Sequence, residues 1–377
     1  VRGTARQGPH PPGAATTTSA SRRASIQRVA RNRSPEYGGH GHREVISKTR
    51  TDGRHITAGL ECGGRSHRFH RYQSGSKLPH SKALRRGETT LGPVKLSVII
   101  PTYDTAEMTL VCCASVVAAL PADAEVIVVD DAWPDDTVRR MEAAFPTVTV
   151  LRQGVNGGFS ASVNAGVAAS RGELVLLLNS DTRVEAGTFD AFLRAFGEDA
   201  QLGVAGAQLV DARGALQWSA GPVPTLLWMV VAVSGIAPLV RPFRRSKKQQ
   251  GDVGWVSGAA MAFRRRVWDA AGPLREDFRF YAQDLDFCVR ARRLGWSVRL
   301  LSEIRVEHRH GATIARGDAL PYKPELLWPD LLTWGRGEYG DAWARRARRW
   351  MIVAAAMRSM VNREFRRGYE ALRNSSS

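Results

Sequence analysis

The sequence is poor in the residues that build metal-thiolate sites and disulfide frameworks. Its 377 residues include only four cysteines, and no two of them have the C-x-x-C spacing: Cys62, Cys112, Cys113 and Cys288. Scattered cysteines of this kind are typical of reduced thiols in a cytoplasmic protein, and we expect that localisation. The sequence therefore predicts neither a structural zinc site nor a disulfide-stabilised fold.

Long apolar segments are also missing. Residues 1–30 have no apolar core, so we expect no signal peptide there. The uncharged segment Thr225–Val240 has 16 residues, whereas a membrane-spanning helix needs about 20. This segment fits a buried helix or a helix lying on a membrane surface beside the basic cluster 241–248. An Arg-rich helical segment at 342–360 fits the same surface, so peripheral contact with the inner face of the membrane is expected.

Neither of the glycine-rich phosphate-binding motifs is found where it would be needed. A dinucleotide-binding fold requires G-x-G-x-x-G after its first strand, and the chain has Pro101-Thr102-Tyr103-Asp104 there. No G-x-x-x-x-G-K-[ST] segment occurs either. We therefore expect a bound phosphate group to be held through a metal ion and not through a glycine-rich loop.

The positive charge is concentrated near the start of the chain. Residues 1–95 hold 19 Lys and Arg against 5 Asp and Glu, and so supply +14 of the net charge of +18. Residues 1–93 show no apolar period, and we predict a disordered tail. The tail fits either a basic arm for nucleic acid or anionic lipid, or a segment without function. A nucleic-acid-binding protein is thus one rival interpretation, although we expect no nucleic acid to bind the folded body.

From Lys95 onward, short apolar strands alternate with helical segments. Strands are predicted at 96–100, 125–130, 147–151, 173–179, 203–210, 253–263 (broken by a glycine turn), 297–301 and 304–308. Helices are predicted at 106–119, 135–144, 160–169, 186–196, from 280 to Gly295, and within 323–372. This alternation predicts an α/β fold with a mostly parallel sheet flanked by helices. We divide the chain into the tail 1–93, a folded domain 94–315 and a C-terminal helical region 316–377.

Acidic side chains follow several of these strands where each one ends. Asp104, Asp130 and Asp181 come directly after the first, second and fourth predicted strands. Because the carboxyl ends of parallel strands share one edge of a sheet, these carboxylates are expected to converge on one crevice. Converging acids require a cation or hydrogen-bond donors, and a nucleoside diphosphate with a divalent cation meets that need. Taken alone, the Asn179–Asp181 tripeptide favours the N-cap of the helix that follows it, and only the other motifs of the sequence favour a ligand site.

Two kinds of side chain in the second half, aspartates and histidines, could also carry chemistry. Asp284 and Asp286 lie in the first turn of a helix, where the helix dipole favours acids. Sugar transfer with inversion, however, also needs a carboxylate that takes the proton of the acceptor hydroxyl. His308 and His310 close a strand and fit either a structural role or a metal-ligand role.

Seven motifs, spread over about 95–315, together resemble the family 2 glycosyltransferases of the GT-A fold, in their rhamnosyltransferase-like bacterial branch. The motifs are Val98–Asp104, Val128–Asp131, Asn156–Gly166, Leu178–Thr182, Ser257–Ala259, Asp284–Arg290 and His308–Thr313. The resemblance implies a GT-A domain at 94–315 and an inverting, metal-dependent hexosyltransferase of cell-wall polysaccharide biosynthesis.

The resemblance also implies a role for each matched position. The nucleoside and the rest of the donor would be bound by Pro101, Thr102, Tyr103, Asp104, Asp130, Asn156, Gly158, Asn164, Asn179 and Ser180. Mg²⁺ or Mn²⁺ would be bound by Asp181 and His308. The acceptor or the sugars would be contacted by Trp255, Ser257, Gly258, Ala259 and Asp286. Asp284 would be the catalytic base.

Three positions depart from the family pattern. Asn179 replaces the first acid of the DXD motif, Gln283 replaces the Glu before the base, and Asp131 stands where Asn is frequent. We expect transfer of rhamnose from dTDP-rhamnose to a cell-surface glycan or a lipid-linked acceptor. A donor such as UDP-galactofuranose is an alternative. Asn179 and Gln283 also allow a catalytically impaired homologue that acts as a scaffold in glycan assembly.

Overall fold

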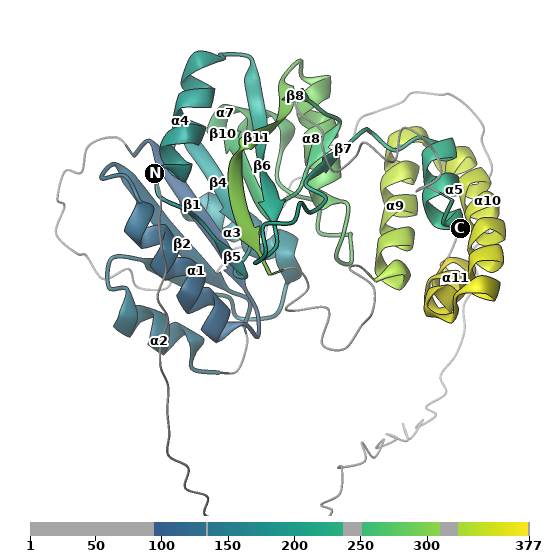
Figure 1. Ribbon diagram of the computed structural model, residues 1–377, viewed down its shortest axis with the longest axis horizontal. Coiled ribbons are helices and arrows are strands. Elements are labelled where there is room, and N and C mark those ends of the chain that lie inside the picture. The colour runs from purple at the N-terminus through teal and green to yellow at the C-terminus, as the bar shows by residue number, and fades with distance from the viewer. Residues whose placement is uncertain (1–93, 133–134, 237–250, 310–322, 376–377) are drawn as a thin grey trace, which may run out of the picture. The chain divides into compact units, whose positions relative to one another are not determined.

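The computed structural model describes residues 94–132, 135–236, 251–309 and 323–375. The predicted tail 1–93, the basic cluster 241–248, and His310 with the rest of its motif lie outside these ranges. All described residues fall in one compact unit, Leu84–Ser377. As predicted, this unit is an α/β fold with a mostly parallel sheet flanked by helices (Figure 1).

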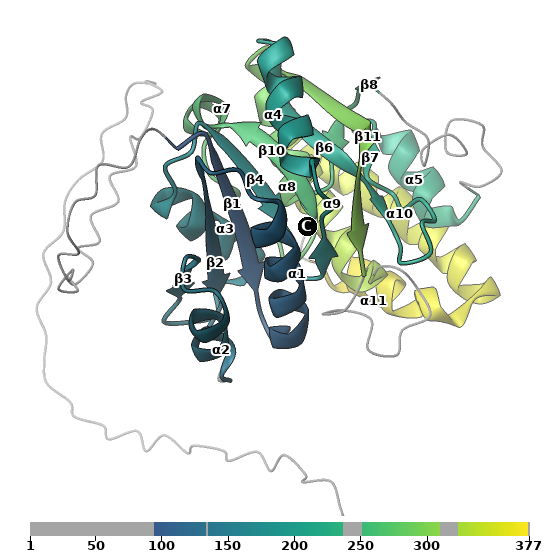
Figure 2. The ribbon, with the colours of Figure 1, turned by 60° about the vertical axis from the view of Figure 1, so that its left-hand side comes forward.

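The described strands form one large sheet and a small two-stranded one. The large sheet has the order β3-β2-β1-β4-β10-β6-β11-β5, and β8 also pairs with β11 (Figure 2). Its strands are β1 Leu96–Thr102, β2 Ala124–Asp130, β3 Thr149–Arg152, β4 Leu174–Leu178, β5 Thr182–Arg183, β6 Leu202–Val210, β8 Gly251–Asp252, β10 Ala260–Arg264 and β11 Ser297–His308. The small sheet pairs β7 Ala220–Gly221 with β9 Trp255–Val256.

The pairing explains why the strands read as apolar runs. β3, β2, β1 and β4 are parallel neighbours, and β10 runs antiparallel between β4 and β6. All seven residues of β1 and all five of β4 are buried, because helices cover both faces of the sheet. The register places Thr102 opposite Asp130, so the polar ends of β1 and β2 are adjacent.

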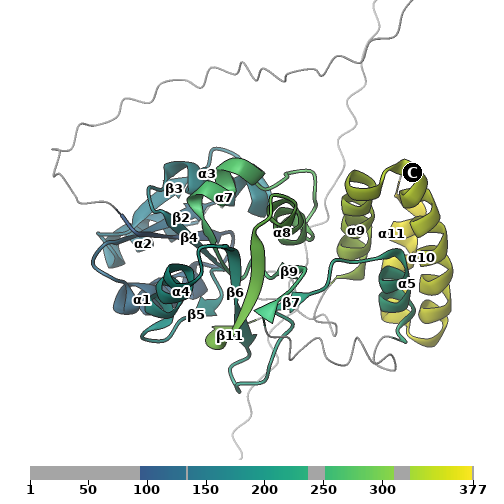
Figure 3. The same ribbon diagram turned by 90° about the horizontal axis from the view of Figure 1, so that it is seen from above.

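Helices cover the two faces of the large sheet (Figure 3). One face packs against α1 Ala106–Ala119, α2 Thr137–Ala144 and α4 Thr188–Glu198. The other face packs against α3 Gly158–Ala169, α7 Arg265–Ala271 and α8 Gln283–Arg293. A β-carbon at Gly166 in α3 would lie 2.5 Å from Cγ2 of Ile99, so glycine is needed for this close approach.

The remaining described helices form a further group, consisting of α5 Leu226–Ser234, α9 Pro324–Tyr339, α10 Asp341–Val361 and α11 Arg366–Asn374, with a short 3₁₀ turn at Arg363–Phe365. Their apolar side chains share a core with α8, which includes Leu285 and Val289. The division at 315/316 remains a prediction. None of the described helices has the length and apolar character that crossing a bilayer requires.

Three sequence predictions need correction. The first strand does not stop at Ile100 but continues to Thr102, because Pro101 tolerates extended backbone near a strand end. The two strands predicted at 297–301 and 304–308 form the single strand β11, with an irregular register between Leu301 and Arg305. Helix α7 was not predicted, because its seven residues are too few for a clear apolar period.

Candidate active site

The polar ends of β1, β2 and β4 meet at one edge of the sheet, as the sequence predicts. Hydroxyl groups connect them: Thr102 Oγ1 lies 3.0 Å from Thr105 Oγ1 and 2.7 Å from Thr109 Oγ1. Thr105 Oγ1 in turn lies 2.9 Å from Ser180 Oγ in the segment after β4. All four side chains are buried, so this network holds the ends of β1 and β4 in a fixed relation.

Two neighbouring acids at the end of β2 have different surroundings. Asp130 is 1% exposed, and its Oδ2 lies 3.6 Å from Nε of Arg152 on β3. Asp131 accepts hydrogen bonds from the backbone N–H groups of Gly157 and Gly158, each at 2.8 Å. Asp131 thereby positions the glycine turn that begins α3, while Asp130 lies directly beside Thr102 on β1.

Backbone strain is concentrated around this edge. Among the described residues, three non-glycine residues have positive φ angles: Asp104 at 52°, Ala132 at 59° and Ala282 at 71°. They follow β1, follow β2 and precede α8, respectively. Such conformations cost about 1–3 kcal/mol each and cluster at functional sites, where the surrounding contacts maintain them.

Asp181 and His308 come together although 127 positions separate them in the sequence. Nε2 of His308 lies 3.3 Å from Oδ1 of Asp181 and 3.5 Å from Nδ2 of Asn179. Pairing of β11 with β5, which sets His308 opposite Thr182, produces this contact. The ring is 6% exposed, so the pair is largely shielded from solvent.

Gln217 determines which ring nitrogen of His308 carries the proton. Its Nε2 donates to the carbonyl oxygen of His308 at 2.7 Å, which leaves its Oε1 facing Nδ1 at 2.9 Å. An amide oxygen only accepts, so Nδ1 is the donor and Nε2 presents a lone pair. In the neutral ring, the lone pair of Nε2 would face Oδ1 of Asp181 at 3.3 Å, and a proton or a cation between the two atoms would remove this repulsion.

These residues fit two ligands of a divalent cation. A carboxylate and an imidazole whose other nitrogen is held by a hydrogen bond are ordinary metal ligands. In the described ranges, no group of three or more His, Cys, Asp and Glu side chains is suited to hold a metal. Mg²⁺ and similar ions frequently take only one or two carboxylates and complete their shell with water and substrate phosphates. The pair suits an ion that is bound together with a diphosphate.

Asp284 lies at the start of α8 and its carboxylate is held by backbone donors. Oδ2 accepts from the N–H of Gly258 at 3.0 Å, and Oδ1 accepts from the N–H of Leu285 at 2.8 Å. Burial raises the pKa of the Asp284 carboxyl, and the two N–H donors oppose this effect only in part. A carboxylate with a raised pKa is a better proton acceptor than an ordinary Asp.

The segment Ser257-Gly258-Ala259 connects the two halves of the site. Gly258 binds Asp284, and the carbonyl oxygen of the next residue, Ala259, accepts from the N–H of Asn179 at 3.0 Å. Ser257 is held by a hydrogen bond from its N–H to the carbonyl oxygen of Ser219 at 2.8 Å. The candidate base and the segment that carries Asp181 are therefore joined through two consecutive residues, Gly258 and Ala259.

Other predicted residues lie in different settings. Asn156 is exposed beside the glycine turn, and Trp255 on β9 contacts Trp218 with ring centroids 6.0 Å apart. The amide of Asn164 is engaged with Leu274, donating to its carbonyl oxygen and accepting from its N–H, both at 2.9 Å. Asn164 thus tethers the loop before α8.

Asp286 has a structural environment. Its Oδ2 lies 2.8 Å from Nε of Arg290, and its Oδ1 lies 3.4 Å from Nη1 of Arg275. Both carboxylate oxygens face arginines, so the contact with acceptor or sugar remains a prediction.

Sequence reasoning did not identify Asp131 or Gln217 as site residues. Only the position of Asp131 next to Asp130 could have indicated it, and no local pattern marks Gln217.

Comparison with known proteins identifies a family and several relatives. Residues 97–271 match the family model described as Glycosyl transferase family 2. An N-acetylglucosaminyl-diphospho-decaprenol L-rhamnosyltransferase of Mycobacterium tuberculosis is 25% identical over 248 residues, which cover 59% of this chain and 79% of that protein. The protein y4gI of Sinorhizobium fredii is 30% identical over 221 residues, covering 55% of this chain but only 23% of its own length.

Two solved structures of low sequence identity are also similar. The mannosyltransferase PcManGT of Pyrobaculum calidifontis, solved with GDP-Man and Mn²⁺, is 16% identical with a TM-score of 0.48, covering 75% of this chain and 76% of that one. A structure of residues 1–349 of S. aureus TarS is 20% identical with a TM-score of 0.42, covering 74% of this chain and 89% of that one.

Proposed function

This chain belongs to glycosyl transferase family 2 through its domain at residues 97–271, and from that premise we propose that it is an inverting sugar transferase with Asp284 as its base. The donor is a nucleotide sugar, with dTDP-rhamnose as the first candidate and UDP-galactofuranose as the second. The acceptor is a cell-surface glycan or a lipid-linked intermediate. The mycobacterial relative, which is named as an N-acetylglucosaminyl-diphospho-decaprenol L-rhamnosyltransferase, supports this choice.

One observation carries the proposal. The backbone of Gly258 and Ala259 holds Asp284 on one side and the Asn179–Asp181 segment on the other, through hydrogen bonds of 3.0 Å each. A base and a phosphate-binding centre must be held in a fixed relation if a hydroxyl group is to attack the sugar carbon opposite the departing diphosphate. This rigid connection supplies that relation.

In the proposed reaction, Asp284 accepts the proton of the acceptor hydroxyl as its oxygen bonds to the anomeric carbon of the sugar. The bond between that carbon and the phosphate oxygen breaks, and its electron pair leaves with the nucleoside diphosphate. A divalent cation bound by Asp181 and His308 would offset the charge on that leaving group. Oε1 of Gln217 accepts a hydrogen bond from Nδ1 of His308, which leaves Nε2 available to the cation.

Donor recognition is proposed to use the ends of β1, β2 and β4. Asp130 is in register with Thr102 at the end of β1, and its carboxylate is proposed to accept a hydrogen bond from the nucleoside. The segment Pro101–Asp104, Asn156, Gly158 and the Asn179–Ser180 pair surround the same edge. Asp131 supports this surface indirectly, because it fixes the backbone of Gly158.

We further propose that α10 contacts an anionic membrane surface at the inner face of the cell membrane. Four apolar side chains at helical spacing are exposed along it: Trp350 (56%), Val353 (52%), Met357 (60%) and Met360 (79%). Arg345, Arg346 and Arg349 are exposed in the preceding turns of the same helix. An apolar stripe with flanking arginines has the chemistry of a helix lying on anionic lipid, where a lipid-linked acceptor would be found.

A panel of sugar nucleotides tests the proposed function. Purified protein is incubated with each donor, Mn²⁺ or Mg²⁺ and a polyprenyl-diphosphate sugar, and released nucleoside diphosphate is measured. We expect acceptor-dependent release from one donor and none from the Asp284→Asn variant. If no donor is turned over although the protein binds a glycan-assembly partner, the scaffold alternative, prompted by Asn179 and Gln283, replaces the proposal.

A further inference from the structure

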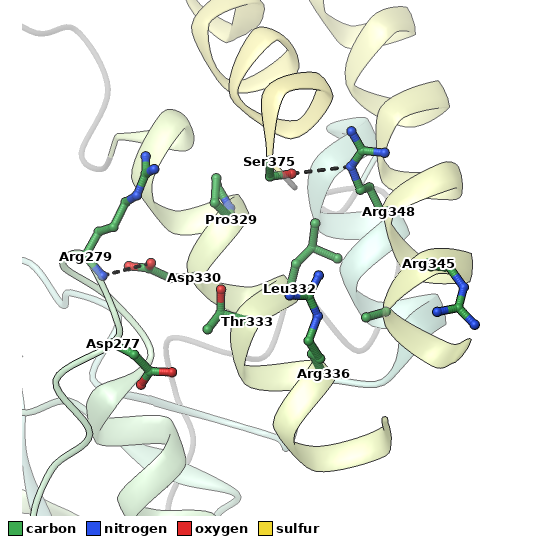
Figure 4. A pocket seen from close by; sticks show the side chains of 11 residues that line it. Asp277, Arg279, Pro329, Asp330, Leu332, Thr333, Arg336, Arg345, Arg348 and Ser375 are labelled. Carbon is green, nitrogen blue, oxygen red and sulfur yellow. Dashed lines mark hydrogen bonds between the residues drawn. The ribbon is translucent and has the colours of Figure 1, made fainter. Parts of the chain in front are cut away.

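A buried carboxylate from outside the family-matched segment binds the loop that precedes the proposed base. Asp330 lies in α9 and is 2% exposed. It accepts hydrogen bonds from three consecutive backbone N–H groups: Arg279 at 3.0 Å, Phe280 at 2.9 Å and Tyr281 at 2.7 Å. Figure 4 shows its carboxylate facing the backbone of Arg279, while the guanidinium of Arg279 points away.

The loop bound by Asp330 leads directly into the first turn of α8. Ala282 follows the three bound amides in a left-handed conformation, with φ 71°, and Gln283 and Asp284 come next. Gln283 turns back and donates from Nε2 to the carbonyl oxygen of Phe280 at 2.9 Å. Asp330 thus binds three N–H groups of the loop, and Gln283 binds the carbonyl group of Phe280 in the same loop. These hydrogen bonds restrict the conformation of the loop.

Apolar packing strengthens the same connection. Phe278, Ala282 and Leu285, from the loop and from α8, belong to one buried cluster with side chains of α9, among them Trp328, Leu331 and Leu332. These apolar contacts lie beside Asp330, which is 2% exposed and also lines a pocket with Arg279 and Thr333. A buried carboxylate with three N–H partners is strongly held, and losing it would leave the amides of exposed Arg279 and of half-buried Phe280 and Tyr281 without this acceptor.

From this geometry we propose that Asp330 is a positioning residue for Asp284. The inference rests on the proposed function and extends it, because it makes the C-terminal helices part of the active site. Asp330 keeps residues 279–282 in the conformation that sets the start of α8, and with it the direction of the Asp284 carboxylate. Without Asp330, the strained Ala282 relaxes and the base moves away from the acceptor hydroxyl.

The test compares Asp330→Asn with the matched control Asp341→Asn. Asn keeps one acceptor oxygen but places an NH₂ group against the remaining amides, so it cannot bind all three. Asp341 begins α10, has a side chain that is 72% exposed, and contacts Arg336 and not the loop. We expect Asp330→Asn to lower kcat about 10- to 100-fold with little change in the donor KM, because a misplacement of about 1 Å has that effect.

Two readouts separate positioning from general destabilisation. Hydrogen exchange at the amides of Phe280 and Tyr281, and tryptic cleavage after Arg279, should both accelerate at least tenfold in Asp330→Asn, while core amides of β1 and β4 stay protected. Asp341→Asn should match wild type in every measurement. If Asp330→Asn exchanges and turns over like wild type, the positioning role is wrong; a loss of protection that is equal in the loop, β1 and β4 would also overturn it.

The exchange measurement keeps the inference independent of the donor. If wild-type protein turns over no sugar nucleotide, the proposed function fails, whereas accelerated exchange confined to residues 279–281 still shows that Asp330 holds the loop. Asp330→Ala serves as the second variant and should show the larger exchange effect, because it removes both acceptor oxygens. An effect of Ala no larger than that of Asn would contradict the hydrogen-bond mechanism.

Discussion

Oδ2 of Asp284 accepts a hydrogen bond from the backbone N–H of Gly258 at 3.0 Å, across 26 positions of sequence. The carbonyl oxygen of the next residue, Ala259, accepts a hydrogen bond from the N–H of Asn179, two positions before Asp181. The backbone of Gly258 and Ala259 thereby connects the start of α8 with the end of β4.

Replacing Asp284 by Asn should abolish the base and leave donor binding in place. We expect turnover to fall by about 10²–10⁴-fold, because an amide cannot take a proton at neutral pH. Turnover is measured by nucleoside diphosphate release and donor affinity by calorimetry. Asp190→Asn, at an exposed position of α4, is the matched control. Turnover of the Asp284 variant within threefold of wild type would rule out this base.

The pH dependence of activity and of stability should both reflect Asp284. Burial raises its pKa above the ordinary Asp value of 3.8, so the acid limb of kcat/KM should lie above that value. The free energy of unfolding should depend on pH in the opposite direction to activity. A raised carboxyl pKa stabilises the folded state at low pH, and this contribution is lost as pH rises through the pKa of the folded state. Asp284→Asn should therefore melt at a higher temperature than wild type at pH 7. The difference should shrink as pH falls towards 4, and a constant difference would contradict the assignment.

Metal-dependent binding of the donor should require the Asp181–His308 pair. Asp181→Ala removes a carboxylate ligand, and Gln217→Ala removes the partner that orients the imidazole. Loss of such an outer partner typically weakens metal affinity about 10- to 100-fold. Donor titrations with and without Mn²⁺ are compared, with Asp190→Ala as control. Unchanged Mn²⁺ dependence in both variants would remove the proposed metal role.

Gly166 and Gly197 offer a pair of substitutions with opposite expected effects on stability. A β-carbon at Gly166 would lie 2.5 Å from Ile99, so Gly166→Ala should destabilise the fold by about 1–3 kcal/mol through overpacking. No atom lies within 4 Å of a β-carbon at Gly197 in α4, so Gly197→Ala should stabilise by about 0.5–1 kcal/mol. Urea unfolding measures both. Equal effects of the two substitutions would show that the contact between α3 and the sheet is not tight.

The exposed stripe of α10 should govern binding to anionic vesicles. Burial of the Met357 side chain in lipid would contribute about 1.5–3 kcal/mol to membrane binding, and Met357→Glu removes this contribution. The loss corresponds to a partition coefficient roughly 10- to 100-fold lower. Sedimentation with vesicles containing anionic lipid measures the bound fraction. Val155→Glu, at a 75% exposed apolar position after β3, is the control. Equal sedimentation of the two variants would count against α10 as the membrane contact.

Much of the sheet could be predicted from local patterns. Apolar runs bounded by helical segments predicted β1, β2, β4 and β6, and the acids that follow them indicated the binding edge. The prediction was less accurate at β11, where one strand with an irregular register resembles two. Short elements such as β5, with two residues, and α7, with seven, carry too few residues for a period to be recognised.

Local periodicity was enough to predict most strands and helices, and the polar residues at strand ends indicated which chemical groups they carry and in what order. The contacts between groups that are distant in sequence become visible in the folded chain alone: Gln217 with His308, Gly258 with Asp284, and Asp330 with residues 279–281. These contacts join a side chain to a backbone group or ring 26 to 91 positions away. Whether they form depends on strand order, register and helix packing, and no local pattern of residues records those.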